Sequence, residues 1–144
     1  MSLVVRRARV EEIRPLRHTV LRPGRPPSAV VWERDDESVH VAAWDGDELV
    51  GCATVTSEND GWRLRGMAVD PTRQRGGVGR AVLEAAVEVV REAGGSEIHA
   101  NARTTALPFY EAMGFSAVGE EFVTSATGLP HKRIVRLLDV TRGP

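Results

Sequence analysis

A glycine-rich turn is the feature that most constrains how this chain can fold. The turn runs from Asp70 to Arg80, reads DPTRQRGGVGR, and joins an apolar, strand-like segment to an amphipathic helical pattern. Glycine lets a backbone approach a ligand closely, and the first N–H groups of a helix have no intrahelical acceptor. A strand, a turn and a helix in this order therefore favour an anion-binding site at the start of the helix.

The hydrophobic pattern around the turn predicts a mixture of strands and helices. Strand-like segments span residues 3–5, 39–44, 48–55, 62–69, 97–100, 115–118 and 134–140. Helical patterns span residues 10–20 and 78–90, and a third helix runs from a cap at Thr105 to residue 113. Asp-Gly pairs at 45–46 and 60–61 predict two hairpins. This order predicts an α/β or α+β fold with a mixed sheet.

Proline and glycine mark where the predicted helices are interrupted or end. Pro15 predicts either a kink in the first helix or a helix that begins near Pro15, because an interior proline removes a backbone hydrogen bond. Gly94-Gly95 and Gly114 predict the ends of the second and third helices. The proline-dense segment 22–28 is predicted to be a loop.

Length and composition restrict the class of protein. The 144 residues, 42% of them hydrophobic and 27% charged, fit one domain over residues 1–144. A formal net charge of -1 argues against nucleic-acid binding, and no apolar stretch reaches the roughly 18 residues needed to span a bilayer. Cys52 is the only cysteine and lies in an apolar run, which predicts a buried, inert thiol. Without a signal-peptide pattern, we expect a cytoplasmic protein.

The spacing of the glycines excludes the common nucleotide-binding motifs. A dinucleotide fingerprint that begins at Gly77 and Gly79 needs a third glycine where the chain has Val82. A loop of the form G-x-x-x-x-G-K-[ST] fails because neither Gly76 nor Gly77 has a glycine five positions on. The pattern that remains is Gln74-x-x-Gly77-x-Gly79 directly after a strand.

A second motif lies downstream of the turn, where residues 106–115 read ALPFYEAMGF. The turn resembles motif A of the GNAT family of N-acetyltransferases, and the second motif resembles the family's A-x-x-F-Y-E-x-x-G-F pattern. Shorter likenesses at 65–69, 101–103, 119–122 and 130–131 extend the resemblance over essentially the whole chain. The chain thus looks like a bacterial subgroup of small single-domain acetyltransferases.

The resemblance implies a fold and a reaction. The GNAT fold has a mixed, mostly antiparallel central sheet of about six or seven strands flanked by about four helices. The implied reaction transfers an acetyl group from acetyl-coenzyme A to a primary amine of a small molecule or peptide, by direct attack while both substrates are bound. It needs no metal, and relatives often form homodimers.

The resemblance also implies which residues bind acetyl-coenzyme A. The amides of the turn would bind the pyrophosphate, and the strand before the turn would pair with the pantetheine arm. The expected binding residues are Met67, Ala68, Val69, Gln74, Arg75, Gly76, Gly77, Val78, Gly79, Arg80, Asn101, Phe109 and Tyr110.

Three residues are expected to take part in catalysis. The Val69 amide would polarise the thioester carbonyl, and Tyr110 would protonate the departing thiolate. Many relatives place a glutamate base on the strand before the turn, but residues 62–69 contain no carboxylate. His131 is the first candidate for the base, because neutral imidazole accepts a proton near pH 7. Glu33, His40 and a chain of water molecules are alternatives.

The sequence says less about the pocket that would bind the acceptor amine. The loop 22–28 and the acidic stretch 33–37 are expected to line the acceptor pocket, and carboxylates there would suit a cationic amine. Because the usual base is missing, a non-catalytic module that binds acyl-coenzyme A is the alternative function.

Overall fold

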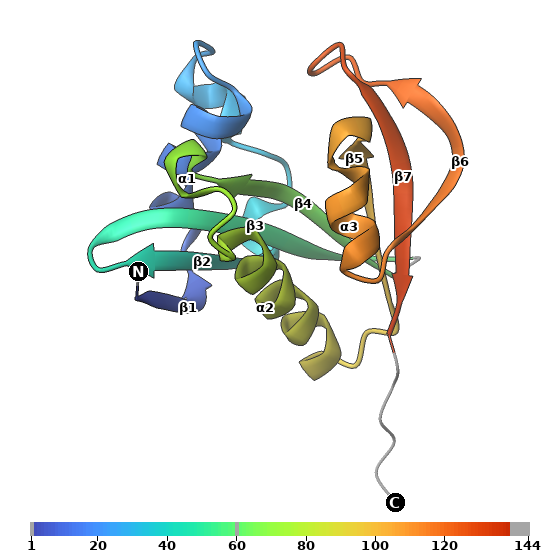
Figure 1. The fold of residues 1–144 in the computed structure, drawn as a ribbon, viewed down its shortest axis with the longest axis horizontal. Helices are drawn as coiled ribbons and strands as arrows, with labels where there is room; N and C mark the ends of the chain where they lie inside the picture. Colours follow the sequence, from blue (N-terminus) through green and yellow to red (C-terminus); the bar gives the residue numbers. More distant parts are fainter. Residues whose placement is uncertain (1, 60, 139–144) are drawn as a thin grey trace, which may run out of the picture.

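The computed structural model describes residues 2–59 and 61–138. Within these residues seven strands form one sheet in the order β1-β2-β3-β4-β5-β7-β6 (Figure 1). The strands are β1 (Leu3–Ala8), β2 (Val39–Asp45), β3 (Glu48–Glu58), β4 (Gly61–Val69), β5 (Glu97–Arg103), β6 (Ser116–Val123) and β7 (Pro130–Leu137). The helices are α1 (Val10–Leu21), α2 (Val78–Glu92) and α3 (Leu107–Ala112), with 3₁₀ turns η1 (Pro27–Val30), η2 (Asp35–Glu37), η3 (Pro71–Arg73) and η4 (Thr104–Ala106). This mixed, mostly antiparallel sheet confirms the predicted fold class.

The first four strands form an antiparallel meander with the predicted hairpins. The β2–β3 hairpin closes at Asp45 opposite Glu48, and Gly46 between them has φ +62. The β3–β4 hairpin closes at Glu58 opposite Gly61, which has φ +127. Glycine adopts positive φ without steric cost, so these residues decide where the sheet folds back. Residue 60, part of the second predicted turn, lies outside the described residues.

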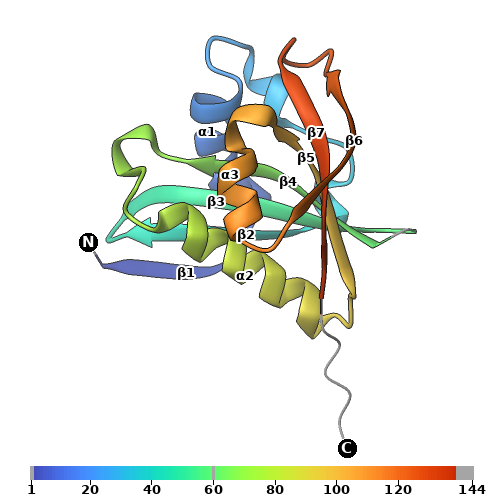
Figure 2. The ribbon, with the colours of Figure 1, turned by 45° about the vertical axis from the view of Figure 1, so that its right-hand side comes forward.

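The helices cover the two faces of the sheet. α1 packs on one face, where Ile13 and Leu16 are buried with Cys52 of β3 and Ala68 of β4. α2 and α3 pack on the other face, as Figures 1 and 2 show. The apolar stripe of α2 belongs to the larger core, and full burial of each such side chain contributes about 1.5–3 kcal/mol.

The predicted helix ends are confirmed. The Gly94 amide donates to the Arg91 carbonyl at 2.9 Å, and the Gly95 amide donates to the Val90 carbonyl at 2.8 Å. Gly94 has φ +82, so this is the left-handed helix ending that glycine favours. Gly114, with φ +91, ends α3 in the same way: its amide donates to the Glu111 carbonyl at 3.1 Å, and the Phe115 amide donates to the Tyr110 carbonyl at 3.0 Å.

Several predicted boundaries were wrong. Thr105 does not cap α3, because Thr105 lies inside η4 and α3 begins after Ala106 with no side-chain cap. α1 begins at Val10 and continues through Pro15, so the helix does not start at the proline. Pairing across the sheet extends β1, β5 and β6 beyond their apolar residues and starts β7 at Pro130. The predicted end of the last strand at residue 140 lies outside the described residues.

Candidate active site

The sheet opens between β4 and β5. Among the described residues of these parallel strands, ladder pairing is limited to Trp62 with Ile98 and Arg63 with His99. Both pairs lie near the starts of the strands, and beyond them β5 runs steeply across the direction of β4 (Figure 1). We call this opening the β4–β5 split. The carboxyl ends of both strands lie at its open end.

A bulge in β4 lies along the split. Cys52 pairs with Ala68 and Thr54 pairs with Arg65, so two β4 residues face one residue of β3. Gly66 lies in the bulge with φ +67, which a residue with a side chain adopts only with strain. A bulge interrupts the ladder and bends the strand, so it helps to turn β4 away from β5.

The Val69 amide points toward the split. The next amide, that of Asp70, donates to the Val50 carbonyl of β3 at 2.9 Å. Because successive amides of a strand point to opposite edges, the Val69 amide points away from β3. It is therefore a backbone donor directed at whatever occupies the split.

The glycine-rich turn is exposed and passes through two left-handed residues. Arg75 has φ +69 and Gly77 has φ +83. Gly77 precedes α2, and its carbonyl accepts the helical bond of Ala81 at 3.0 Å. The three amides before Ala81 precede the first helical donor, and anions at a helix start gain about 0.3–1 kcal/mol from the dipole. The turn has the backbone geometry of the predicted anion site. Gln74, Gly76 and Arg80 are exposed in it, and Val78 is buried beneath it.

Two side chains hold the turn in place. Arg73 forms ion pairs with Asp45 and Glu48, at the two ends of the β2–β3 hairpin. The Asp70 carboxylate accepts hydrogen bonds from the Thr72 amide and hydroxyl, each at 2.9 Å. The Arg73 ion pairs tie the turn to the β2–β3 hairpin, and the Asp70 bonds fold the turn on itself before α2 begins.

Gly79 brings the two sequence motifs together. A Cβ atom at Gly79 would lie 3.5 Å from the Phe109 ring and 3.5 Å from the Val69 side chain. The start of α2, the end of β4 and the first turn of α3 therefore meet at one point. Met67 and Ala68 precede this point on β4. The predicted residues of the turn, the strand and α3 thus form one continuous region.

Tyr110 lies beside this region in the core. Its ring packs edge-on against Phe109 and Phe115, with ring centres 5.1 and 5.7 Å away. Burial raises the pKa of the Tyr110 hydroxyl to about 12. The phenol is therefore protonated at neutral pH and is able to donate a hydrogen bond.

Asn101 and His131 lie on the opposite face, the face that α1 covers. Ala100 and Ala102 of β5 belong to the core beneath α2 and α3, so their neighbour Asn101 and the last strand residue Arg103 point the other way. Arg103 pairs directly with His131 of β7, and residues opposite each other in a ladder share a face. The structure thus separates Tyr110 and His131 onto the two faces of the sheet.

The hydrogen bond of His131 selects its tautomer. Nδ1 lies 2.8 Å from the Leu129 carbonyl, which can only accept, so Nδ1 carries a hydrogen. In the neutral ring, Nε2 is then the nitrogen that accepts a proton. The imidazole also stacks on Phe122, with ring centres 6.1 Å apart. His131 therefore has a fixed orientation and the tautomer that a base requires.

The alternative bases differ in their surroundings. His40 is buried, with Nδ1 2.8 Å from the Thr54 hydroxyl and Nε2 2.9 Å from the Asp35 carbonyl. Burial is the main cause that lowers the pKa of His40, and both ring nitrogens are already bonded within the protein. The Glu33 side chain is exposed, and its carbonyl accepts a hydrogen bond from Arg65.

The sequence did not predict the buried ion pair between Arg17 and Asp35. Arg17 of α1 is fully buried and binds the Asp35 carboxylate through both oxygens, at 2.9 and 3.0 Å. Its guanidinium also donates to the Thr54 hydroxyl at 2.7 Å and lies 4.0 Å from the centre of the Trp32 ring. Arginine in an apolar helix stripe was the available signal, but its partner is not local in sequence.

The charge on Asp35 is stabilised by this pair. Burial raises the pKa of Asp35, but hydrogen bonds from Arg17 and from the Trp32 amide outweigh burial and lower it overall. Arg14 and Arg65 approach the same carboxylate at 3.5 and 3.6 Å. Asp35 is therefore bound to arginines inside the protein. It does not line a pocket for a cationic amine, so the expectation for the acidic stretch 33–37 is wrong at this residue.

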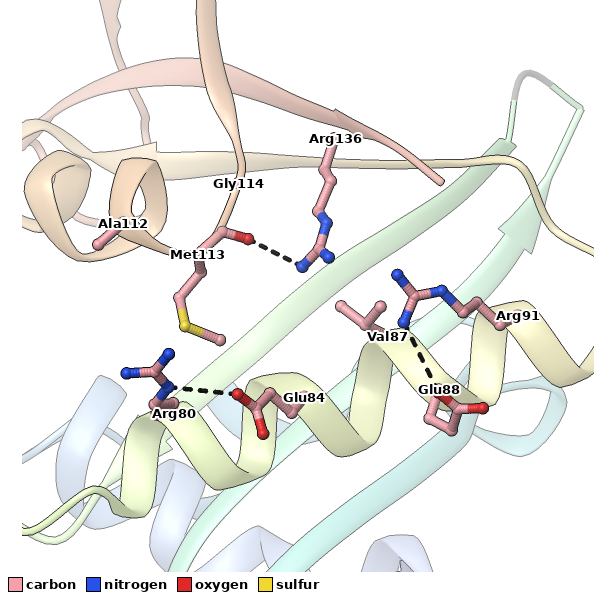
Figure 3. Close-up of a pocket in the computed structure, with 9 residues that line it drawn as sticks. All are labelled: Arg80, Glu84, Val87, Glu88, Arg91, Ala112, Met113, Gly114 and Arg136. Carbon is pink, nitrogen blue, oxygen red and sulfur yellow. Dashed lines mark hydrogen bonds and ion pairs between the residues drawn. The ribbon is translucent and has the colours of Figure 1, made fainter. Parts of the chain in front are cut away.

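A cavity of about 510 Å³ lies along α2 on the side of α3 and β7 (Figure 3). Arg80 pairs there with Glu84 at 3.2 Å, and the Arg136 guanidinium donates to the Met113 carbonyl at 2.8 Å. The cavity begins in the first turn of α2, where Arg80, the last residue of the glycine-rich turn, lines it. It therefore adjoins the candidate anion site.

Comparison with known proteins shows to which family a chain with this arrangement belongs. Residues 11–132 match the model of the acetyltransferase (GNAT) domain. The chain belongs to the GNAT acetyltransferase family. This match spans α1, the split and the start of β7, so it includes the elements described above. The resemblance predicted from the two motifs is confirmed.

Individual GNAT relatives agree with the family match. The uncharacterized N-acetyltransferase YjcF of Bacillus subtilis (strain 168) is 27% identical over 111 residues, which cover 77% of this chain and 79% of the relative. A putative N-acetyltransferase from Lactobacillus plantarum has the same fold, with a TM-score of 0.82, 18% identity and coverage of 96% and 99% of the two chains. An aminoglycoside 6'-N-acetyltransferase complexed with coenzyme A gives a TM-score of 0.76 at 17% identity, over 98% and 99% of the chains.

Two other findings bear on the predicted partners. No helix among residues 2–59 and 61–138 has the length and apolar character needed to cross a membrane. The described residues hold no group of three or more His, Cys, Asp or Glu side chains that fits a metal ion. Cys52 is fully buried, which confirms that part of the prediction, and burial raises the pKa of its thiol to about 12.

Proposed function

We propose that residues 1–144 act as one N-acetyltransferase domain that transfers an acetyl group from acetyl-coenzyme A to a primary amine. The observation that carries the proposal is the β4–β5 split with the glycine-rich turn at its rim. In this family member the split offers a free strand edge, and the turn offers amides for the pyrophosphate. The relative complexed with coenzyme A has the same fold, which supports this choice of donor.

The donor molecule would lie along residues that the structure brings together. The amides of residues 75–80 would bind its phosphates, and the exposed Arg75 and Arg80 would add charge-assisted hydrogen bonds. Met67, Ala68 and Val69 would pair with the pantetheine arm. Phe109 contacts the turn and would cover the arm from α3.

The proposed reaction uses groups that lie on both faces of the sheet, beside the split. The amine nitrogen attacks the thioester carbon while the Val69 amide donates to the carbonyl oxygen, and the C–N bond forms as the C–S bond breaks. His131 Nε2 takes the proton that the amine loses, directly or through water. Coenzyme A leaves as a thiolate that accepts a hydrogen bond from Tyr110 and takes a proton, from Tyr110 or from water, while His131 returns its proton to the solvent.

Tyr110 is the residue that we expect to assist the departing thiolate. A phenol with a pKa of about 12 is a weaker acid than a thiol, whose ordinary pKa is about 8.5. Tyr110 therefore acts on the thiolate first through a hydrogen bond as the C–S bond breaks.

The proposal is tested with the purified chain, acetyl-coenzyme A and a broad panel of primary amines and peptides. Free thiol is followed over time, and mass spectrometry identifies the acetylated amine. We expect thiol release that depends on both substrates. Calorimetry with coenzyme A measures donor binding separately. Tight binding without thiol release would favour the non-catalytic module, and no binding of coenzyme A would overturn both readings.

A further inference from the structure

Three arginines belong to elements on the sheet face that α1 covers, which we call the acceptor face because it holds His131, the candidate base. Arg103 is the last residue of β5 and points to the face that α1 covers. Arg22 follows the last turn of α1, and the Arg25 amide donates to the Arg22 carbonyl at 3.2 Å. We call Arg22, Arg25 and Arg103 the arginine cluster.

The charges of this cluster act on one another. Burial, together with the positive charges of Arg103 and Arg25, lowers the pKa of Arg22. No carboxylate is among the causes of that shift. In the acidic stretch before β2, Asp35 is committed to Arg17 and Glu37 pairs with Arg34 at 2.8 Å. Like charges held together at a partly buried position stabilise a bound anion.

The cluster is on the wrong face for the phosphates of the donor. The glycine-rich turn starts α2, which packs on the opposite face of the sheet. His131, the candidate base, pairs with Arg103 in the ladder and shares its face. An anion on the cluster would therefore belong to the molecule whose amine reaches His131.

We propose that the acceptor is an anionic amine, a molecule with a primary amine and a carboxylate or phosphate group that Arg22 and Arg103 bind. The proposal rests on the acetyltransferase function above and specifies its substrate class. It replaces the cationic acceptor that the acidic stretch suggested. Arginine recognises both carboxylate and phosphate by paired hydrogen bonds, so the two anions share one chemistry at this site.

The test uses matched pairs of amines. The first arm compares α-, β- and γ-amino acids with their carboxamides, and the second compares O-phosphorylated amino alcohols with the free alcohols. We expect kcat/KM to be about 10-fold or more higher for the anionic member of at least one series. The arm that shows the preference identifies the anion. Equal kcat/KM for both members of every pair would overturn the proposal.

Variants locate the preference. Arg103→Gln and Arg22→Gln should each lower kcat/KM for the anionic amine about 10-fold or more and leave the neutral analogue unchanged. Arg103→Lys should restore part of the loss. Arg7→Gln, a change at an exposed arginine of β1, is the control and should keep the full preference. A rise in KM for acetyl-coenzyme A in the Arg103→Gln variant, without loss of the anion preference, would assign the cluster to the donor and refute the proposal.

Failure of the proposed function gives a different result. If no amine is acetylated, calorimetry of the same amine pairs with the wild-type chain still measures the site. Binding of the anionic member that is lost in Arg103→Gln supports the arginine cluster as the anion site. No difference in binding within any pair would contradict it.

Discussion

Arg17 binds both carboxylate oxygens of Asp35, and both side chains are buried. The pair joins α1 to η2 and holds Trp32 against the bulge of β4, where a Cβ atom at Gly66 would lie 2.7 Å from the indole ring. The bulge in turn shapes the edge of the split. A buried ion pair on one side of the sheet thus supports the strand proposed to bind the donor.

Breaking this pair should destabilise the fold strongly. In Asp35→Asn the buried Arg17 charge loses its counterion, and the free energy of unfolding should fall by about 3–5 kcal/mol. Glu37→Gln, which breaks the exposed pair with Arg34, is the control and should change it by less than about 1 kcal/mol. Urea unfolding measures both. Similar small changes in the two variants would show that the buried pair adds no stability.

His40 should make the fold less stable in mild acid. Burial lowers the pKa of His40 in the folded chain, whereas the unfolded chain titrates near the ordinary value of about 6.5. As the pH falls below that value, the unfolded chain binds a proton that the folded chain does not, so stability falls. Unfolding at pH 7.5 and 5.5 should show the decrease. His40→Gln should reduce the slope and His18→Gln should keep it, and an unchanged slope in His40→Gln would refute this account.

Gly77→Ala should impair donor binding specifically. Gly77 and Gly94 lie at opposite ends of α2, both have positive φ, and a Cβ atom at either would have open space within 4 Å. Alanine at either position should lower stability by about 1–2 kcal/mol, because its Cβ disfavours the left-handed conformation. We expect the KM for acetyl-coenzyme A to rise in Gly77→Ala and to stay constant in Gly94→Ala. Equal KM values in the two variants would show that the turn does not bind the donor.

Tyr110→Phe should lower turnover and leave donor binding intact. The loss of a hydrogen bond to a charged leaving group predicts a decrease of about 10- to 100-fold in kcat. Since the phenyl ring keeps its packing on Phe109 and Phe115, unfolding should change little. Initial rates over a range of pH measure the effect. Unchanged turnover at every pH would exclude Tyr110 from the reaction.

His131→Gln should slow acetyl transfer. The variant lacks a group that accepts the proton of the amine, so kcat/KM should fall about 10-fold or more. His40→Gln is the matched control, since its ring nitrogens are bonded inside the protein. An unchanged kcat/KM in His131→Gln would favour the chain of water molecules as the base.

The sequence predicted best those features that depend on one residue or on its near neighbours in the chain. The glycines at 94 and 114 end helices because their conformation depends on one residue, and the apolar stripe of α2 follows from helical spacing. Strand lengths were less well predicted, since β6 is exposed along its whole length and exists through its pairing with β7. Such pairing has no signature in the strand's own hydrophobic pattern.

The sequence by itself determined the family, the order of the elements and the anion-binding turn, because motif spacing and backbone preference are properties of neighbouring residues. The tertiary structure alone decided the partners of its charged groups. It buried Asp35 against Arg17, and it placed Arg103 beside His131 on the acceptor face. These outcomes depend on the register of strands far apart in the chain and on which side chains lose water when the sheet forms, and no local pattern encodes either.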